Sequence, residues 1–381
     1  MIIYLDNSAT TRPSAAVMEA MRQAMTDGYF NPSALYKPAV QAEKRMDDCR
    51  ALIASKLGVK DRVIFTSGGT EADNLATLGC LPRRRRTGGR ILYSAGEHPA
   101  VIESCKAAVA QGFEAVEIPL LVNGLVDLPA LDSLLSSDTL LICIMQVNNE
   151  TGAVQPLKAI AAQRDERCPD ALLHVDGVQG YLRLPCQAKE IGIDSYALSA
   201  HKFHGPKGVG ALWISPRVRL QPQLYGGGQE SGLRPGTHNT PGIAGLDAAI
   251  ATYPVINAMR DLKLRLYERL REAIPTLEVN GPDPNSAQAA DHILNISFPP
   301  VRSETLLHAL EAEEVYVGNG AACSSRSGKG SHVLRAMGLS SQRVQSAIRF
   351  SLNPFLCRQD IDAAANAVIQ SYKLLKGYSR H

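Results

Sequence analysis

The sequence predicts a two-part α/β protein. Its large domain is expected to hold a seven-stranded, mostly parallel sheet flanked by helices, and its second domain to be a smaller α+β unit. From about residue 60 to residue 215, short apolar runs alternate with helix-like stretches, as strands and helices do in such a sheet. After Pro254 a long charged helix leads to a second set of strand-like runs. A length of 381 residues also favours more than one core.

Seven apolar runs are expected to form the large sheet. In chain order they are RVIFTS (62–67), RILYSA (90–95), FEAVEIP (113–119), LLICIMQV (140–147), ALLHVD (171–176), DSYALSA (194–200) and VGALWIS (209–215). Several are apolar throughout, which is typical of strands covered on both faces. Ligands of open α/β sheets bind outside the carboxyl ends of the strands, so functional side chains are expected directly after these runs.

The large domain is expected to span residues 16–254, and the small domain to combine residues 1–15 with residues 255–381. Its expected elements are a helix over about 256–273, the strands ILNISF, VYVG and AIRFSL, a helix beginning near His332, and a final helix over about 359–376. A loop over about 319–331, rich in glycine and serine, contains Cys323.

Composition and charge narrow the class of function. The formal net charge is +3, which argues against a protein that coats nucleic acid or an anionic membrane. No stretch approaches the roughly 18 apolar residues of a membrane span, and the start lacks the features of a signal peptide. The eight cysteines are scattered, with no C-x-x-C pair and no histidines at metal-ligand spacing. We therefore expect a soluble, cytoplasmic protein without a metal site that acts on a small ligand.

A phosphate site is expected after the first run. RVIFTS leads into Gly68, Gly69 and Thr70 and then a helical stretch. Free backbone N–H groups and the helix dipole at such a position bind anions. The alternative is an ordinary glycine turn with a threonine cap.

Two charged side chains follow successive strands of the expected sheet. Asp176 ends ALLHVD, with Gln179 three residues later, and Lys202 follows DSYALSA next to Ser199 and His201. A carboxylate buried there needs a cation, and a protonated pyridine nitrogen would serve. A lysine with a lowered pKa can act as a Schiff-base nucleophile. Together these residues are what a bound aldehyde cofactor requires, whereas Lys202 alone could be a surface lysine.

Two further polar residues follow strands in the same way. His98, in AGEHPAV, could stack on a flat cofactor and move protons near neutral pH; its alternative is a helix cap. Asn149, in QVNNETG, could hydrogen-bond a ring hydroxyl or a substrate carboxylate; its alternative is a turn-forming asparagine before Gly152.

The smaller domain carries a candidate nucleophile and a candidate clamp. Cys323 lies among small residues close to Arg326 and Lys329, which favour the thiolate. A thiol in such a loop suits a nucleophile that reaches a substrate atom and then carries it away. Arg349, within AIRFSL, could bind a carboxylate through two hydrogen bonds, or form a strand-edge ion pair.

In combination, these motifs resemble the NifS-like cysteine desulfurases, which belong to the class-V aminotransferases and the fold-type I pyridoxal phosphate enzymes. The resemblance spans almost the whole chain, with ten motifs in the family's order. They are YLDNSATT (4–11), NPSALY (31–36), TSGGTEADN (66–74), EHPAV (97–101), NNETG (148–152), HVDGVQ (174–179), SAHKFHGPKG (199–208), GGGQESGLRPGT (226–237), GAACSS (320–325) and RFSL (349–352).

The resemblance implies a role for each candidate residue. Lys202 would form the Schiff base with pyridoxal phosphate, Asp176 would pair with the ring nitrogen, Gln179 would contact the ring oxygen, and His98 would stack on the ring and move protons. The phosphate would be held by Gly69, Thr70, Ser199 and His201, and by Thr237 from the second subunit of a homodimer. Asn149 and Arg349 would bind the carboxylate of L-cysteine.

The implied reaction removes sulfur from L-cysteine, gives L-alanine and leaves a persulfide on Cys323. The long loop around Cys323 is similar to that of the family's first group, which passes sulfur directly to acceptor proteins. The acceptor would be an iron–sulfur scaffold or a relay for tRNA thiolation. A selenocysteine lyase, or a non-catalytic persulfide carrier of the same fold, are the alternatives.

Two departures from the family's pattern stand out. Gly69 occupies a position where alanine is common, and we expect this to have little effect on phosphate binding. The sequence ends at YSRH without the extended tail that some members use to dock a scaffold, which leaves the acceptor open. The arginine run at 83–86 is interpreted as a solvated loop or, alternatively, as a contact for an acidic partner or RNA.

Overall fold

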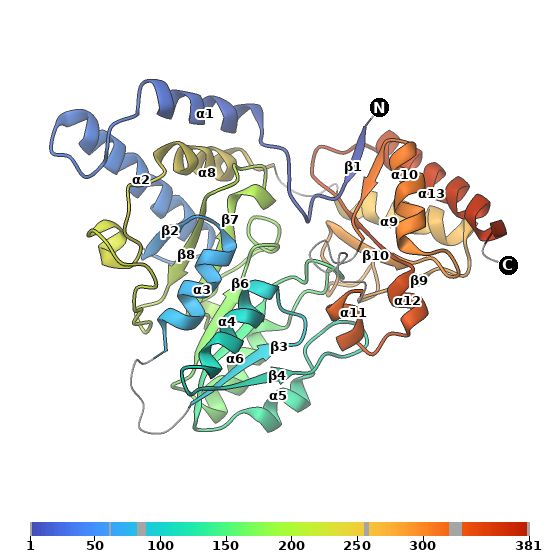
Figure 1. Ribbon diagram of the computed structural model, residues 1–381, viewed down its shortest axis with the longest axis horizontal. Coiled ribbons are helices and arrows are strands. Elements are labelled where there is room, and N and C mark those ends of the chain that lie inside the picture. Colours follow the sequence, from blue (N-terminus) through green and yellow to red (C-terminus); the bar gives the residue numbers. More distant parts are fainter. Residues whose placement is uncertain (1, 61, 82–88, 255–258, 320–329, 379–381) are drawn as a thin grey trace.

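A computed structural model describes residues 2–60, 62–81, 89–254, 259–319 and 330–378 of the chain. Its strands belong to three sheets of seven, three and two strands. Helices cover the seven-stranded sheet, and the C-terminal elements gather beside it (Figure 1). No helix among these described ranges combines the length and the apolar character needed to cross a membrane.

The seven predicted runs all form strands of one sheet. They are β2 (Val63–Thr66), β3 (Arg90–Ser94), β4 (Glu114–Ile118), β5 (Thr139–Met145), β6 (Leu172–Asp176), β7 (Ser195–Ser199) and β8 (Gly210–Ile214). Their spatial order is β2-β8-β7-β6-β5-β3-β4. The strand β8 runs antiparallel to both neighbours, and the other pairs are parallel. The mostly parallel sheet is therefore confirmed.

Helices connect these strands and cover the sheet. Most strand residues are therefore buried on both faces of the sheet. The helices are α1 (Ala15–Thr26), α2 (Lys37–Lys56), α3 (Gly69–Gly79), α4 (Pro99–Val109), α5 (Leu128–Leu134), α6 (Leu157–Arg167), α7 (Ala188–Ile191), α8 (Thr240–Thr252) and the short 3₁₀ turns η1 (Ala200–Lys202) and η2 (Gln229–Gly232).

The C-terminal part forms the smaller sheets with help from the N-terminus. Its elements are β1 (Ile3–Leu5), α9 (Met259–Ala273), β9 (Glu278–Val279), β10 (Ile293–Ser297), α10 (Ser303–Ala312), β11 (Val315–Val317), α11 (His332–Ala336), α12 (Ser341–Gln345), β12 (Ala347–Ser351) and α13 (Arg358–Tyr378). The N-terminal strand β1 pairs in parallel with β11 and lies among the orange and red elements of Figure 1. Strand β10 lies between β12 and β9, antiparallel to both.

Two large hydrophobic cores follow from this arrangement. One lies around the seven-stranded sheet, and the other joins Ile3 and Leu5 to the apolar faces of α9, α10, α13 and β10–β12. Helix α11 departs from this division, because its Val333 and Leu334 pack in the first core. The domain limits at residues 15 and 254 stay a prediction.

Candidate active site

A cavity of about 530 Å³ opens at the carboxyl ends of the central strands, where the parallel sheet predicts a ligand site. It collects side chains from the large sheet, from the N-terminal segment and from β12. The predicted site residues that line it are Gly69, Thr70, His98, Asn149, Asp176, Gln179, Ser199, His201, Lys202 and Arg349. Residues more than 300 positions apart in the sequence therefore share one pocket.

The expected phosphate end is formed at the start of α3. Gly69 is the first residue of α3, and Gly69 and Thr70 line the cavity. The unpaired backbone N–H groups of the first turn of this helix are therefore at the cavity. A Cβ on Gly69 would lie 2.8 Å from Cγ2 of Val178, so alanine at this position requires Val178 to shift. The Nδ1 atom of His201 lies 3.1 Å from Oγ1 of Thr10, and burial lowers the pKa of His201 to about 4, so this ring is neutral at neutral pH.

Asp176 is the last residue of β6, and its side chain is buried. Its Oδ1 atom accepts a hydrogen bond from the backbone N–H of Val178 at 2.9 Å. Burial, followed by the nearby carboxyl of Asp73, raises the pKa of Asp176 to about 6, while His98 opposes this rise. A cation in the cavity would offset the unfavourable burial of the negative charge and thereby stabilise the ionised carboxylate of Asp176.

Lys202 ends the 3₁₀ turn that follows β7. Its Nζ donates to the backbone carbonyls of Ser8 at 2.7 Å and Ala9 at 2.9 Å. Burial, and then the positive charges of Arg349 and Arg183, lower the pKa of Lys202 to about 8. The amine lies in the cavity wall rather than on an open surface, and a substantial share of it is neutral near pH 8.

His98 is both the predicted helix cap and a cavity residue. Its Nδ1 accepts the backbone N–H of Ala100 at 3.1 Å at the start of α4, so the proton of the neutral ring lies on Nε2. Burial lowers the pKa of His98. The neutral ring can therefore accept a proton only at Nδ1, by releasing its cap bond, while Nε2 is a hydrogen-bond donor.

Gln179 reaches the cavity with both ends of its amide already engaged. Its Nε2 donates to the carbonyl of Ser8 at 3.0 Å, and its Oε1 accepts from Nη1 of Arg183 at 3.1 Å. Each amide atom retains one further hydrogen-bonding position. The contact with a ring oxygen stays a prediction.

Arg349 lies in β12 and is only 3% exposed. Its Nη2 pairs with Oδ1 of Asp6 at 2.5 Å, and its Nη1 donates to the backbone carbonyl of Asn149 at 3.0 Å. Among the described residues, its Nε has no hydrogen-bond partner. The ion pair considered as an alternative is thus present, and it also aims the guanidinium at the cavity next to Asn149.

Four buried residues of this site were not predicted. Asp73, Glu97, Glu150 and His332 are buried or half-buried around the cavity, and three of them line it. Burial raises the pKa of Asp73 to about 8 and that of Glu150 to about 7. Two of them directly flank a predicted residue in the sequence, as Glu97 precedes His98 and Glu150 follows Asn149. Their position next to predicted site residues is the feature of the sequence that could have identified Glu97 and Glu150.

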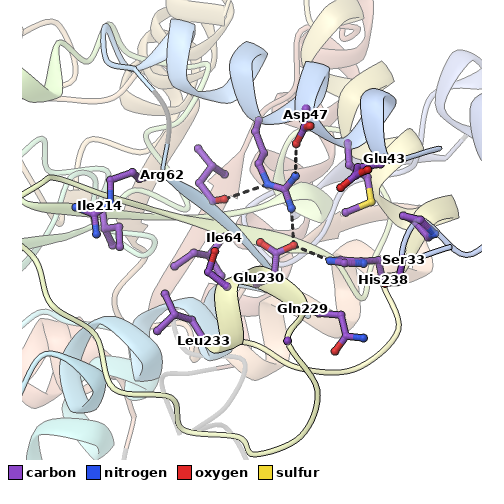
Figure 2. A pocket seen from close by; sticks show the side chains of 16 residues that line it. Ser33, Glu43, Asp47, Arg62, Ile64, Ile214, Gln229, Glu230, Leu233 and His238 are labelled. Atoms are coloured by element: carbon purple, nitrogen blue, oxygen red, sulfur yellow. Dashed lines mark hydrogen bonds and ion pairs between the residues drawn. The ribbon is translucent and has the colours of Figure 1, made fainter. Parts of the chain in front are cut away.

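Thr237 does not line the cavity of its own chain and is exposed. It lies on the segment after η2 and directly precedes His238, which lines a second cavity of about 770 Å³ (Figure 2). The buried carboxylate of Glu230 holds this segment, because it bonds Arg50 at 2.6 Å and His238 at 2.9 Å. Cys323 and the arginine run at 83–86 lie outside the described residues.

Comparison with known proteins places the chain in a family. The family model "Aminotransferase class-V" matches residues 3–364. "Cysteine desulfurase IscS" of Methanosarcina thermophila is 37% identical over 99% of this chain and 93% of that protein. "Cysteine desulfurase" of a Nostoc species is 39% identical over 97% and 91%.

Solved structures agree with the sequence relatives. The structure named "NIFS-LIKE PROTEIN" superposes with a TM-score of 0.90 at 32% identity and covers 98% of this chain and 100% of its own. "SspA in complex with cysteine" has a TM-score of 0.82 at 30% identity and covers 93% and 99%. The chain therefore belongs to the class-V aminotransferases and, within them, to the cysteine desulfurases.

Proposed function

We propose that the chain removes sulfur from L-cysteine with pyridoxal phosphate as cofactor, releases L-alanine and carries the sulfur as a persulfide on Cys323. The observation that carries this proposal is the single cavity that holds a lysine of lowered pKa and a buried aspartate beside a buried arginine. These three groups match the aldehyde, the ring nitrogen and the substrate carboxylate of the reaction.

The cavity residues fit the cofactor. The helix start at Gly69 and Thr70, with Ser199 and His201, offers backbone and side-chain donors for a phosphate. The buried carboxyl of Asp176 lacks a cationic hydrogen-bond partner among the described residues and would gain one from a ring nitrogen. Bound pyridoxal phosphate supplies an aldehyde for amines and a ring that takes up the electrons released at the substrate α-carbon.

The chain's own groups then bind substrate and move protons. Arg349 and Asn149 bind the carboxylate of cysteine, with Asp6 fixing the guanidinium through its ion pair. The Nζ of Lys202 would be the amine that holds the cofactor aldehyde, and as a free amine of lowered pKa it would take the α-proton of the substrate. His98 takes part in the same proton transfer by accepting a proton at Nδ1 when its helix-cap bond opens, since Nε2 already carries the proton of the neutral ring.

Sulfur transfer is the role proposed for Cys323. Its thiolate attacks the sulfur of the bound cysteine, so that an S–S bond forms and the Cβ–S bond breaks. The electron pair of the broken bond stays with the carbon fragment, which takes up a proton and leaves as alanine. The persulfide then passes to an acceptor protein, for which we propose an iron–sulfur scaffold or a tRNA-thiolation relay in the cytoplasm.

We also propose that the chain acts as a homodimer. Large apolar side chains are exposed within a few residues in the sequence of Ser33 and Gly228, which line the second cavity; among them are Leu35 at 96% and Tyr225 at 80%, and exposed apolar patches favour burial against a partner. Thr237 is exposed in the same region. A second copy would bury these side chains and could bring Thr237 to the phosphate of its neighbour.

The proposal is tested with Cys323→Ala and Cys357→Ala. Cys357 is an exposed free thiol and serves as the matched control. Both variants are expected to keep the visible absorbance of the bound cofactor. Only Cys323→Ala is expected to stop sulfide release from L-cysteine in the presence of a thiol reductant, which reduces the persulfide to sulfide. Full turnover in Cys323→Ala would refute the persulfide role, and a colourless wild-type protein would favour the non-catalytic carrier. Faster turnover of L-selenocysteine than of L-cysteine would favour the selenocysteine lyase.

A further inference from the structure

The start of α11 is tied to the cavity wall by two polar contacts that the proposed reaction does not use. The hydroxyl of Ser331 donates to the carboxylate of Glu150. The Nε2 atom of His332 donates to the backbone carbonyl of Glu97 at 3.1 Å. Glu97 follows β3 and Glu150 follows β5, and both Glu150 and His332 line the cavity. Helix α11 is therefore attached to the carboxyl edge of the large sheet.

The turn that carries Glu150 is itself rigidly held. The Oδ1 atom of Asn148 accepts the backbone N–H groups of Glu150 and Thr151, each at 2.9 Å. The side chain of Asn295 in β10 donates to the backbone carbonyl of Glu150 at 3.0 Å. The carboxyl of Glu150 is 3% exposed, so its position is set from both sides and its burial opposes a charge there.

Packing reinforces the attachment of α11. Val333, Leu334 and Met337 are buried in the core of the large sheet, although the segment follows the elements of the smaller sheets in sequence. The hydroxyl of Ser331 also accepts the backbone N–H of Leu334 at 3.0 Å and thereby caps the helix. One hydroxyl thus joins the helix cap to the cavity wall.

The described chain before this segment is fixed at the same cavity. Gly318 and Arg349 exchange two backbone hydrogen bonds of 2.9 and 2.8 Å, and the side chain of Arg349 lines the cavity. Gly318 and Ser331 therefore mark two fixed points at the active site, and Cys323 lies between them in the sequence.

We propose that Glu150 is a positioning residue for sulfur transfer, which acts by holding Ser331 and thereby fixing where the segment with Cys323 rejoins the fold at the cavity wall. The proposal rests on the proposed function, since the location of this fixed point matters only if Cys323 receives the sulfur. Two fixed ends keep the thiol at a high effective concentration near the substrate sulfur. Losing the Ser331 contact would let the point at which this segment rejoins the fold shift relative to the cavity, and a misplacement of reacting groups slows their reaction.

The test compares Ser331→Ala with Ser331→Thr and Ser340→Ala in the holoenzyme. Threonine keeps the hydroxyl. Ser340 caps the neighbouring helix α12 through its bond to Arg343, so Ser340→Ala removes a similar cap that does not contact Glu150. Each protein is mixed with L-cysteine, and two quantities are followed: the absorbance change of the cofactor on substrate binding, and the persulfide on Cys323 by rapid quench and mass spectrometry.

Ser331→Ala is expected to form the persulfide about 10- to 100-fold more slowly, since small misplacements of reacting groups have effects of this size. Its cofactor absorbance change on binding cysteine is expected to match that of the wild type. Ser331→Thr should recover the wild-type rate of persulfide formation, and Ser340→Ala should retain it. Glu150→Gln keeps an acceptor oxygen for Ser331, so its rate of persulfide formation should fall less than that of Glu150→Ala.

Equal persulfide rates in Ser331→Ala and Ser340→Ala would overturn the proposal. So would an equal loss in the cysteine-dependent absorbance change and in persulfide formation, because that result indicates general damage to the site. A wild-type protein that forms no persulfide on Cys323 would instead refute the proposed function. The two failures are thereby distinguished.

Discussion

Replacing Gly318 by alanine tests the clamp proposed for the substrate carboxylate. A Cβ at this position would lie 2.7 Å from Oδ1 of Asp6, 2.8 Å from Nη2 of Arg349 and 2.9 Å from its Nε. Carbon atoms do not approach so closely, and Arg349 has little free space at 3% exposure. The guanidinium must therefore shift from its present position, and its ion pair with Asp6 is disturbed.

Overpacking of this kind costs about 1–3 kcal/mol. If the cost falls on the binding of the carboxylate, the affinity for L-cysteine drops about 5- to 100-fold, at about 1.4 kcal/mol for each factor of ten. The assay is a titration of the cofactor absorbance with L-cysteine. A parallel titration with cysteamine, which has the amine and the thiol but no carboxylate, should give the same affinity in Gly318→Ala as in the wild type.

Gly228→Ala is the matched control for this substitution. Nothing lies within 4 Å of a Cβ at Gly228, and its φ of −86° suits any residue. The control should bind L-cysteine as the wild type does. An unchanged affinity in Gly318→Ala, or an equal loss for cysteine and cysteamine, would refute the assignment of Arg349 to the substrate carboxylate.

Three further predictions concern two site residues and one ion pair. Because the pKa of Lys202 is lowered to about 8 from 10.5, the rate at which apoprotein attaches pyridoxal phosphate should rise with pH up to about 8 and then level off, as followed by absorbance; a rise that continues to about 10.5 would contradict this. Because the pKa of Asp176 is raised to about 6 and its ionised form is the one that pairs with a cation, cofactor affinity should fall as the pH drops below about 6. The variant Asp176→Asn should bind the cofactor more weakly and lose this pH dependence in equilibrium dialysis. Arg164→Met removes the buried ion pair with Asp194 and leaves that carboxylate only the longer pair with Arg217 at 3.7 Å, so it should cost about 3–5 kcal/mol in denaturant unfolding. Arg167→Met on the same helix breaks an exposed pair and should change little; equal effects would contradict the role of burial.

Much of the sheet and of the cavity could be predicted from local sequence patterns. Apolar runs such as those around Ile142 and Tyr196 can only be strands of a covered sheet, and polar residues at the ends of parallel strands must meet at one edge. That reasoning predicts His98, Asp176 and Lys202 at one edge of the sheet, and all three line the cavity there.

Contacts between distant segments could not be predicted in the same way. The carbonyls of Ser8 and Ala9 that bind the amine of Lys202, and the pair between Asp6 and Arg349, depend on how the N-terminal segment crosses the sheet. Local sequence patterns do not encode such a crossing.

Buried carboxyls were missed for a related reason. In the sequence, Glu150 belongs to a polar turn, and only the packing of α11 and β10 against that turn buries its carboxyl.

The space around Gly69 could not be predicted from the sequence either. Glycine in place of alanine is expected to have little effect on phosphate binding. In the structure, however, an alanine side chain at this position would contact Val178 too closely, so Val178 would have to shift.

The central claim is that Cys323 receives the sulfur of L-cysteine at the cavity that holds Lys202. The most direct measurement is mass spectrometry of the peptide containing Cys323 after the holoenzyme has reacted with L-cysteine without reductant, alongside Lys202→Ala. The account predicts a mass increase of one sulfur atom on Cys323 in the wild type, one alanine released for each persulfide, and neither product in Lys202→Ala. An unmodified Cys323 in an enzyme that still releases alanine would contradict it.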